Sequence, residues 1–489
     1  MLHAALGGAH GREGIAMPER PYAHPVIDAD GHLLEFGAAV FERAEEIAGP
    51  DVAAALRAAL GRTSIDGAPP WQALDPEERR RTRTARLPWW AFPTSNTLDR
   101  ATALLPALLH ERLPELGIDF AVLYPSMAIP FPQMFRSREL RSATCRAYND
   151  LYGELYAPYS DRITIGGLVP MHSPDEAVEE LRFAVESCGL KTVVIPSYVI
   201  RPADDGSDWP WIDTYGIDSP HDYDPFWAAC VELGVSVAAH SPAYGRPWNG
   251  RRSISNFVYN HIGTFADAGE AMCKSLFLGG VTRRFPGLRV AFLEGGVGWG
   301  ARVYADLVSH WHKRGLAGLE HLDPANLDRA ELLRLARRYG GKLAERYPTD
   351  DELLQAMGAV DRTVVDPDLK DEFAACAIER PEDIRDLFAV PFFFGCEADD
   401  PTIGSAFSPA NPCGARLGAM FGSDIGHWDV RDMREVVPEA YEEVEKGRLS
   451  AEEFHAFVFA NAVRFFTDTN PTFFDGTAVA DDVARLRAG

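Results

Sequence analysis

Short apolar runs rich in β-branched and aromatic residues recur along the chain, with helical patterning between most of them. Nearly continuous hydrophobicity over so short a run is typical of strands that are covered on both faces, as in a parallel sheet. Eight such runs can be counted, and each predicts a strand: Pro25–Asp30, Phe120–Ser126, Ile163–Pro170, Thr192–Ser197, Val235–His240, Leu288–Glu294, Pro391–Cys396 and Ala419–Asp424.

The segments between these runs carry helix signals. Pro174–Ser187 follows Ser173, has Asp175 and Glu176 in its first turn and ends before Gly189, which is the expected order of a capped helix. Further long amphipathic segments predict helices at Arg138–Tyr156, Trp299–Arg314 and Ala451–Phe466. Eight strands alternating with helices predict an α/β fold, a (β/α)₈ TIM barrel. A doubly wound open sheet uses the same alternation and is the main competitor.

The chain is longer than a bare barrel, which takes about 250 residues. Two insertions account for the difference, at about 36–116 and 315–386. The predicted division is a flexible leader at 1–24, a metal-dependent barrel with its insertions at 25–466, and a C-terminal loop tail at 467–489. Within the leader, Met17 is an alternative translation start.

Charge and composition narrow the class of function. The net charge of −24 argues against a nucleic-acid or anionic-membrane partner, because both attract an excess of Lys and Arg. No run approaches the roughly 20 apolar residues of a transmembrane helix. The seven cysteines are scattered without a C-x-x-C pair, which fits a reducing cytoplasm.

Potential metal ligands stand at the ends of several predicted strands, where barrel enzymes place their reactive residues. Asp30 and His32 are two apart and therefore share a face of the first strand. The other strand-end candidates are His240, Glu294 and Asp424, with His427 three residues beyond the last. Imidazole and carboxylate ligands suit Zn²⁺, Fe²⁺ or Mn²⁺, and we expect one or two such ions per chain.

Each of these residues also has an ordinary structural explanation. His240 could be a hydrogen-bonded core histidine, Asp424 a helix cap, and Glu294 an acceptor for the amides of the two glycines that follow it. Their joint occurrence at one end of four predicted strands favours a metal site.

Five segments resemble those of a known enzyme family. They read VIDADGH at 26–32, VAAH at 237–240, GGVTRRFPGLRVAFLEGG at 279–296, FGSDIGH at 421–427 and NAVR at 461–464. In this order they are similar to the amidohydrolase superfamily, specifically the amidohydrolase-2 branch that includes non-oxidative decarboxylases. The resemblance covers the chain from about residue 25 to residue 466.

The resemblance implies roles for individual residues. Asp30 and His32 occupy the position of the metal-binding pair, and His240 that of the strand-5 ligand. Asp424 matches the strand-8 aspartate, which both contacts metal and moves protons. Glu294 departs from the pattern, because many of the decarboxylases have a histidine there; a carboxylate would repel an anionic substrate unless it binds metal or is protonated.

Other residues complete the expected pocket. His261 is either a substrate contact or, with Glu294, a ligand of a second metal. Lys191 lies at the wrong end of its strand for a bridging ligand and is assigned to structure. The predicted substrate-binding residues are Trp89, Trp90 and Tyr124, and the rim candidates are Glu397 and Asp399.

These features favour a metal-dependent hydrolase. Metal-activated water would attack an ester, thioester, amide or lactone carbonyl of a hydrophobic or aromatic acid, with Asp424 moving the proton and His261 and His427 stabilising the oxyanion. The alternatives are a metal-dependent non-oxidative decarboxylase of an aromatic acid and a catalytically inactive barrel that binds a partner. The charged second insertion also suggests a homodimer.

Overall fold

The computed structural model describes residues 20–60, 71–88, 95–202, 210–242, 252–359 and 370–488. Its centre is an eight-stranded sheet in which every pair given by the register is parallel, in the order β1-β2-β3-β4-β7-β8-β9-β10. The strands are β1 (Ile27–Leu33), β2 (Phe120–Pro125), β3 (Ile163–Leu168), β4 (Thr192–Pro196), β7 (Ser236–His240), β8 (Val290–Phe292), β9 (Phe392–Cys396) and β10 (Gly418–Phe421). Each of the eight predicted runs overlaps one of these strands.

Backbone hydrogen bonds close the sheet between its first and last strands. The amide of Asp424, just after β10, donates to the carbonyl of Asp30 at 3.1 Å, and the amide of His32 donates to the carbonyl of Ile425 at 3.0 Å. These bonds and the flanking helices make the fold a (β/α)₈ barrel, as predicted, and exclude the open sheet. An antiparallel hairpin, β5 (Val199–Arg201) and β6 (Trp211–Asp213), follows β4.

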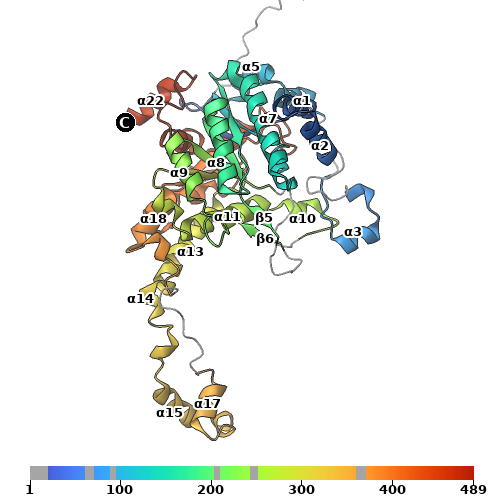
Figure 1. Cartoon of the computed structure of the whole chain (residues 1–489). Coiled ribbons are helices and arrows are strands. Elements are labelled where there is room, and N and C mark those ends of the chain that lie inside the picture. Colours follow the sequence, from blue (N-terminus) through green and yellow to red (C-terminus); the bar gives the residue numbers. More distant parts are fainter. Residues whose placement is uncertain are drawn as a thin grey trace, which may run out of the picture.

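Helices surround the barrel (Figure 1). Between and after the strands they are α6 (Phe131–Met134), α7 (Arg138–Tyr156), α8 (Pro174–Arg182), α9 (Asp224–Leu233), α10 (Phe257–His261), α11 (Thr264–Leu278), α12 (Val281–Arg284), α13 (Gly298–Arg314), α18 (Pro381–Ala389), α19 (Val436–Glu445), α20 (Ala451–His455) and α21 (Asn461–Thr467). The predicted helix start at Ser173 is confirmed, since its side chain accepts a hydrogen bond from the amide of Glu176.

The two insertions behave differently. The first forms α1 (Gly37–Ala48), α2 (Pro50–Leu60), α3 (Pro76–Thr82), α4 (Thr97–Leu104) and α5 (Pro106–Leu116). In it, Arg43 of α1 forms ion pairs with Asp150 and Glu154 of α7. The second forms α14 (Leu316–Leu319), α15 (Arg329–Tyr339), α16 (Lys342–Glu345) and α17 (Asp350–Ala356), which extend away from the barrel (Figure 1).

The C-terminal segment differs from the predicted loop tail. It contains α22 (Ala480–Ala488), and before it Phe473 and Phe474 are buried against Phe120 at the start of β2. Two adjacent phenylalanines flanked by polar residues give no periodic signal, so the sequence pattern alone did not reveal this packing.

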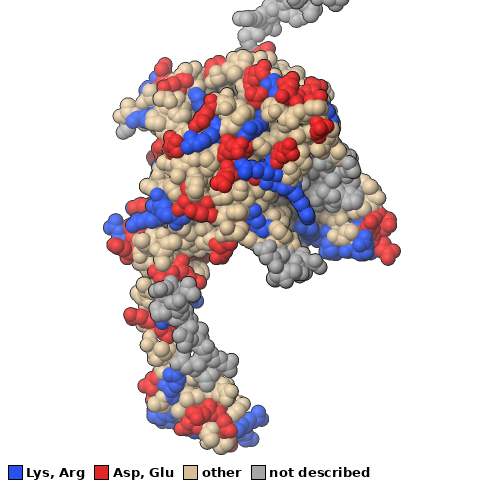
Figure 2. Space-filling model, in the orientation of Figure 1, with Lys and Arg blue, Asp and Glu red and all other residues tan. Residues whose placement is uncertain are grey.

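Charged side chains of both signs are interspersed over the face shown in Figure 2, without a continuous basic area. Among the described residues, every helix is too short or too polar to cross a membrane.

Candidate functional site

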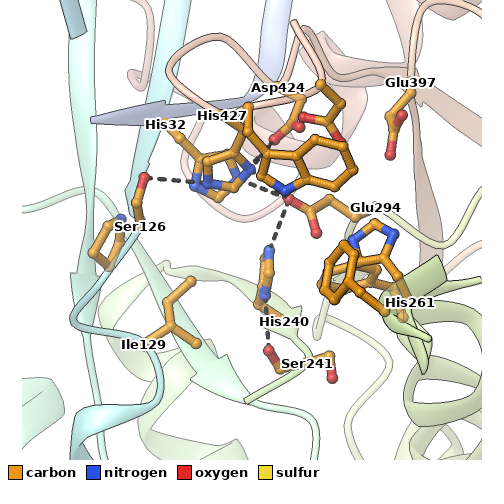
Figure 3. A pocket seen from close by; sticks show the side chains of 15 residues that line it. His32, Ser126, Ile129, His240, Ser241, His261, Glu294, Glu397, Asp424 and His427 are labelled. Atoms are coloured by element: carbon orange, nitrogen blue, oxygen red, sulfur yellow. Dashed lines mark hydrogen bonds and ion pairs between the residues drawn. The ribbon is translucent and has the colours of Figure 1, made fainter. Parts of the chain in front are cut away.

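A pocket lies at the carboxyl ends of the barrel strands (Figure 3). Its volume is about 540 Å³, including space open to solvent. The described residues that line it are His32, Pro125, Ser126, Ile129, His240, Ser241, Phe257, His261, Phe265, Glu294, Glu397, Asp424, His427, Trp428 and Asp429.

Three imidazoles surround one carboxylate oxygen at the bottom of this pocket. Oε1 of Glu294 lies 3.2 Å from Nε2 of His32, 3.3 Å from Nε2 of His240 and 3.3 Å from Nδ1 of His427. Oδ1 of Asp424 lies 3.5 Å from Nε2 of His32. Separations of this size are expected between ligands that share one ion about 2 Å away.

Several of these atoms are buried without a hydrogen-bond partner among the described residues. They are Oδ1 of Asp30, both ring nitrogens of His32, Nε2 of His240, Oε1 of Glu294 and Oδ1 of Asp424. Unsatisfied buried polar atoms are costly, and here they belong to residues that gather at one point. A divalent cation would satisfy them, so the donor set fits a metal. The described residues contain two groups that can hold one: His32, Glu294, Asp424 and His427, and Glu397, Asp424 and Asp429.

The backbone is strained at the two residues that bear carboxylates of this cluster, Glu294 and Asp424. Glu294 and Asp424 both have positive φ angles, 55° and 51°, which non-glycine residues adopt rarely. Such conformations cluster at functional sites because the surrounding structure holds them in place. Asp28 supports the second turn, since it accepts hydrogen bonds from the amide and hydroxyl of Ser423 at 2.9 and 2.6 Å.

The buried charges shift one another's pKa values. Burial alone would lower the pKa of His240, but the Glu294 carboxylate raises it to about 9. Burial alone would raise the pKa of Glu294, but His240, His32 and His427 hold it well below its usual value. The pKa of His32 falls to about 3 through burial and the nearby His427. Burial, Asp429 and Glu294 raise the pKa of Asp424 well above its usual value.

One wall of the pocket is aromatic. The ring of His261 lies 5.1 Å from Phe257, 5.5 Å from Phe265 and 5.4 Å from Trp428 between centroids. The structure therefore places His261 in this wall, outside both groups of candidate metal ligands. Its predicted role as a substrate contact stays open, and its predicted role as a ligand gains no support.

Acidic side chains also line the pocket. Glu397, which follows β9, lies near Asp424 and Asp429, and burial together with Asp429 raises its pKa well above the usual value. Glu397 is thus part of the pocket, whereas Asp399 is exposed and does not line it.

The remaining predicted residues lie elsewhere. Tyr124 is fully buried in the barrel interior and is not among the pocket-lining residues, so its predicted substrate contact is not supported. Trp89 and Trp90 lie outside the described residues. Lys191 donates a hydrogen bond to the carbonyl of Phe473 at 2.8 Å, as suits a structural residue.

Some site residues carried no usable sequence signal. Ser126, Trp428 and Asp429 reach the pocket from loops after β2 and β10. Asp28 was detectable in principle, because it stands two residues before Asp30 on the same face of the strand.

Comparison with known proteins supports the resemblance. A family model described as "Amidohydrolase" matches residues 27–324, which is more than half of the chain. The gamma-resorcylate decarboxylase of Rhodococcus jostii (strain RHA1) is 29% identical over 185 residues, 37% of this chain and 53% of that protein. The 2-amino-3-carboxymuconate-6-semialdehyde decarboxylase of Dictyostelium discoideum is 27% identical over 157 residues, 30% of this chain and 36% of the relative. The match therefore spans about half of the first relative and about a third of the second.

A solved amidohydrolase from Mycobacterium avium subsp. paratuberculosis K-10 shares the fold, with a TM-score of 0.52 and 16% identity over 91% of this chain and 100% of that chain. The two curated relatives contradict the expected hydrolase activity, because both are named decarboxylases. The preference for hydrolysis depended on reading Glu294 as repulsive to an acid, but three imidazoles surround its Oε1 atom. The chain belongs to the amidohydrolase-2 branch of the amidohydrolase superfamily, the enzyme branch that includes non-oxidative decarboxylases.

Proposed function

We propose that the chain is a metal-dependent non-oxidative decarboxylase of an aromatic carboxylic acid. The observation that carries the proposal is Asp424, a buried carboxyl with a raised pKa that faces the imidazole cluster inside the pocket. A raised pKa favours the protonated form of this carboxyl, which is the form that an acid catalyst needs. The decarboxylase names of the two curated relatives support the same activity.

Asp30, His32, His240, Glu294 and Asp424 would hold the divalent ion. When bound, the ion neutralises the carboxylates and attracts the oxygens of an anionic substrate. We propose Zn²⁺, Fe²⁺ or Mn²⁺, with one or two ions per chain, because the donors are imidazoles and carboxylates.

The chain's own groups account for orientation and proton transfer. The wall formed by Phe257, Phe265 and Trp428 would pack against the substrate ring. Asp424 would give its proton to the ring carbon that bears the carboxylate, forming a C–H bond. The bond from that carbon to the carboxylate then breaks, its electron pair restores the aromatic ring, and carbon dioxide leaves. Solvent returns a proton to Asp424, so the reaction needs no oxidant or reductant.

Glu294 is compatible with this function because its charge is compensated. In the metal-free protein the imidazole of His240 lies 3.3 Å away with its pKa raised to about 9, and the two form an ion pair. In the loaded enzyme the ion that both residues would hold compensates the charge of Glu294 instead. The described lining residues include no Lys or Arg, and the substrate carboxylate would therefore depend on the bound ion and the imidazoles.

The test measures carbon dioxide release by protein loaded with each of the three metals. The substrates are benzoic acids with hydroxyl or amino groups beside the carboxylate, and the product is analysed after reaction in D₂O. We expect metal-dependent release and one deuterium at the carbon that lost the carboxylate. Absence of release with every metal and acid would contradict the proposal.

We further propose that the chain forms a homodimer through the second insertion. We call this insertion, residues 315–386, the arm. Large apolar side chains of the arm are exposed, including Leu335, Tyr339 and Leu343. Residues 329–346 carry six Lys or Arg and two Glu, a net +4, so the rest of the chain carries −24 − 4 = −28. A second copy therefore offers a surface of complementary charge. A cytoplasmic location stays a prediction, consistent with seven free cysteines.

A further inference from the structure

A tight turn after β10 brings His427 back onto the site. Asp424 and Gly426 have φ angles of 51° and 97°, and the amide of His427 donates to the carbonyl of Asp424 at 3.1 Å. A Cβ at position 426 would lie 2.8 Å from the carbonyl oxygen of His32. Glycine is therefore required there, both for the backbone conformation and for the close approach. The turn stacks the His427 ring on that of His32, with centroids 3.8 Å apart.

The two ring nitrogens of His427 face different partners. Nδ1 lies 2.5 Å from Oδ1 of Asp424 and 3.3 Å from Oε1 of Glu294, inside the group that can hold a metal. Nε2 lies 3.2 Å from the hydroxyl of Ser126, on the outer side of the ring (Figure 3).

Ser126 determines which nitrogen carries the proton. Its hydroxyl donates to the carbonyl of Leu33 at 2.8 Å, and that hydrogen is then not available to His427. A carbonyl can only accept, so both hydrogen bonds of this hydroxyl form together only when its oxygen accepts from Nε2–H of His427. In the neutral ring that binds a metal, the lone pair of His427 is then on Nδ1, the nitrogen that lies 2.5 Å from Asp424 and 3.3 Å from Glu294.

His240 shows the same arrangement with the nitrogens exchanged. Its Nδ1 lies 3.1 Å from the carbonyl of Ser241, which can only accept, so in the neutral ring that binds a metal the lone pair is on Nε2, 3.3 Å from Oε1 of Glu294. Metal-binding histidines usually donate their other N–H to a carbonyl, carboxylate or water, which fixes the tautomer. His240 and His427 are both prepared in this way.

We propose that His427 is a metal ligand through Nδ1 and that Ser126 is its positioning residue. This inference rests on the metal dependence of the proposed function and adds a third imidazole to the expected donors. It replaces the predicted role of His427 as an oxyanion-stabilising group. Three imidazoles favour Zn²⁺ or Fe²⁺ over Mn²⁺, because carboxylate and water ligands suit Mn²⁺ better.

The first experiment measures the dissociation constants of Zn²⁺ and Mn²⁺ by competition with a chelator, starting from metal-free full-length protein. We expect His427→Ala to weaken Zn²⁺ binding at least about 100-fold and Mn²⁺ binding much less. Ser126→Ala should weaken Zn²⁺ binding about 10-fold, since it removes only the acceptor that fixes the tautomer. The matched control is His261→Ala, which removes an imidazole from the same pocket and should leave the Zn²⁺ affinity unchanged.

A second variant gives a positive signal that loss of stability cannot imitate. His427→Cys loaded with Co²⁺ should develop a thiolate-to-cobalt charge-transfer absorption, because a cysteine at a ligand position binds the ion directly. His261→Cys loaded with Co²⁺ should show none. This variant decides the question if His427→Ala does not fold.

Wild-type Zn²⁺ affinity in folded His427→Ala, or no charge-transfer band in Co²⁺-loaded His427→Cys, would overturn the proposal. Both measurements read metal binding and need no turnover. A wild-type enzyme that binds Zn²⁺ but releases no carbon dioxide would contradict the decarboxylase function and leave the assignment of His427 standing.

Discussion

At the scale of single residues, the site brings together buried carboxylates that shift one another's pKa values. Asp30 and Asp424 both have raised pKa values, through burial and through neighbours that include Glu294. Glu294 itself stays charged because the histidines surround it. The pKa values of neighbouring acids are thus shifted in opposite directions, which is how a single pocket can provide both an anion and a proton donor.

Asp424→Asn tests the proton donor. An amide keeps the shape of the side chain but cannot supply the proton, so we expect the rate of carbon dioxide release to fall at least about 10³-fold. The circular dichroism spectrum and the thermal midpoint should stay near those of the wild type. Normal turnover in this variant would rule out Asp424 as the acid.

The ion pair between Glu294 and His240 predicts how the protonation of His240 depends on pH. In metal-free protein His240 should remain an imidazolium through neutral pH, because its pKa is raised to about 9. Glu294→Gln removes the main cause of that increase, and burial should then lower the pKa of His240 below its ordinary value of 6.5. Histidine ¹⁵N chemical shifts followed from pH 5 to pH 10 give both values, and an unchanged titration would refute the pairing.

The sequence predicted those site residues whose place in the barrel follows from their position on a strand or at its end. Asp30 and His32 alternate on one strand, and His240, Glu294 and Asp424 each follow or end another, so topology alone brings them together. Ser126 and Asp28 act through contacts with residues about 300 to 400 positions away in the chain, His427 and Ser423 respectively. No local pattern encodes such a contact.

At the scale of elements, the loop after β2 is held by a carboxylate from the end of β1. Glu35 accepts hydrogen bonds from the amides of Met127 and Ala128 at 3.0 and 2.9 Å. The same loop begins with Ser126, the proposed positioning residue. Burial raises the pKa of Glu35 to about 7, against an ordinary value of 4.5, in spite of these hydrogen bonds.

Glu35→Gln should therefore change how stability depends on pH. The folded wild type binds this proton more tightly than the unfolded chain, so the stabilisation is complete below pH 4.5 and is lost as pH rises to about 7. Gln does not titrate. The free energy of unfolding of the wild type minus that of the variant should thus fall by about 3 kcal/mol between pH 4.5 and pH 8. Denaturant titrations of metal-free protein measure it, and a difference independent of pH would disprove the shift.

At the scale of the whole molecule, the barrel was predictable and the shape of its insertions was not. Apolar strands, capped helices and ligand-bearing strand ends all indicate one fold, and the hydrogen bonds between β1 and β10 confirm it. The second insertion has helical patterning but few buried residues, and no residue of α15 is buried. A helix without a core to pack against has no preferred place that a sequence pattern could indicate.

The exposed arm gives the prediction that concerns the assembly. Leu335 and Tyr339 are four apart on α15 and share a face, and both are exposed. Exposed apolar patches of this kind mark interaction sites in folded proteins. Replacing these two residues and Leu343 with Ser should convert a dimer into a monomer without loss of the barrel's circular dichroism. Light scattering coupled to size-exclusion chromatography measures the mass.

The matched control replaces three equally apolar exposed residues on the barrel itself, Ile217, Val231 and Val390, with Ser. The control should remain a dimer, because these residues lie outside the arm. Raising the ionic strength should weaken the wild-type dimer, since the basic segment 329–346 faces an otherwise acidic chain. A monomeric wild type, or a variant that remains a dimer after the arm substitutions, would contradict a homodimer formed through the arm. Because the substituted arm residues belong to an insertion outside the barrel and its pocket, a monomeric arm variant should retain its Zn²⁺ affinity, which separates the role of the arm from that of the site.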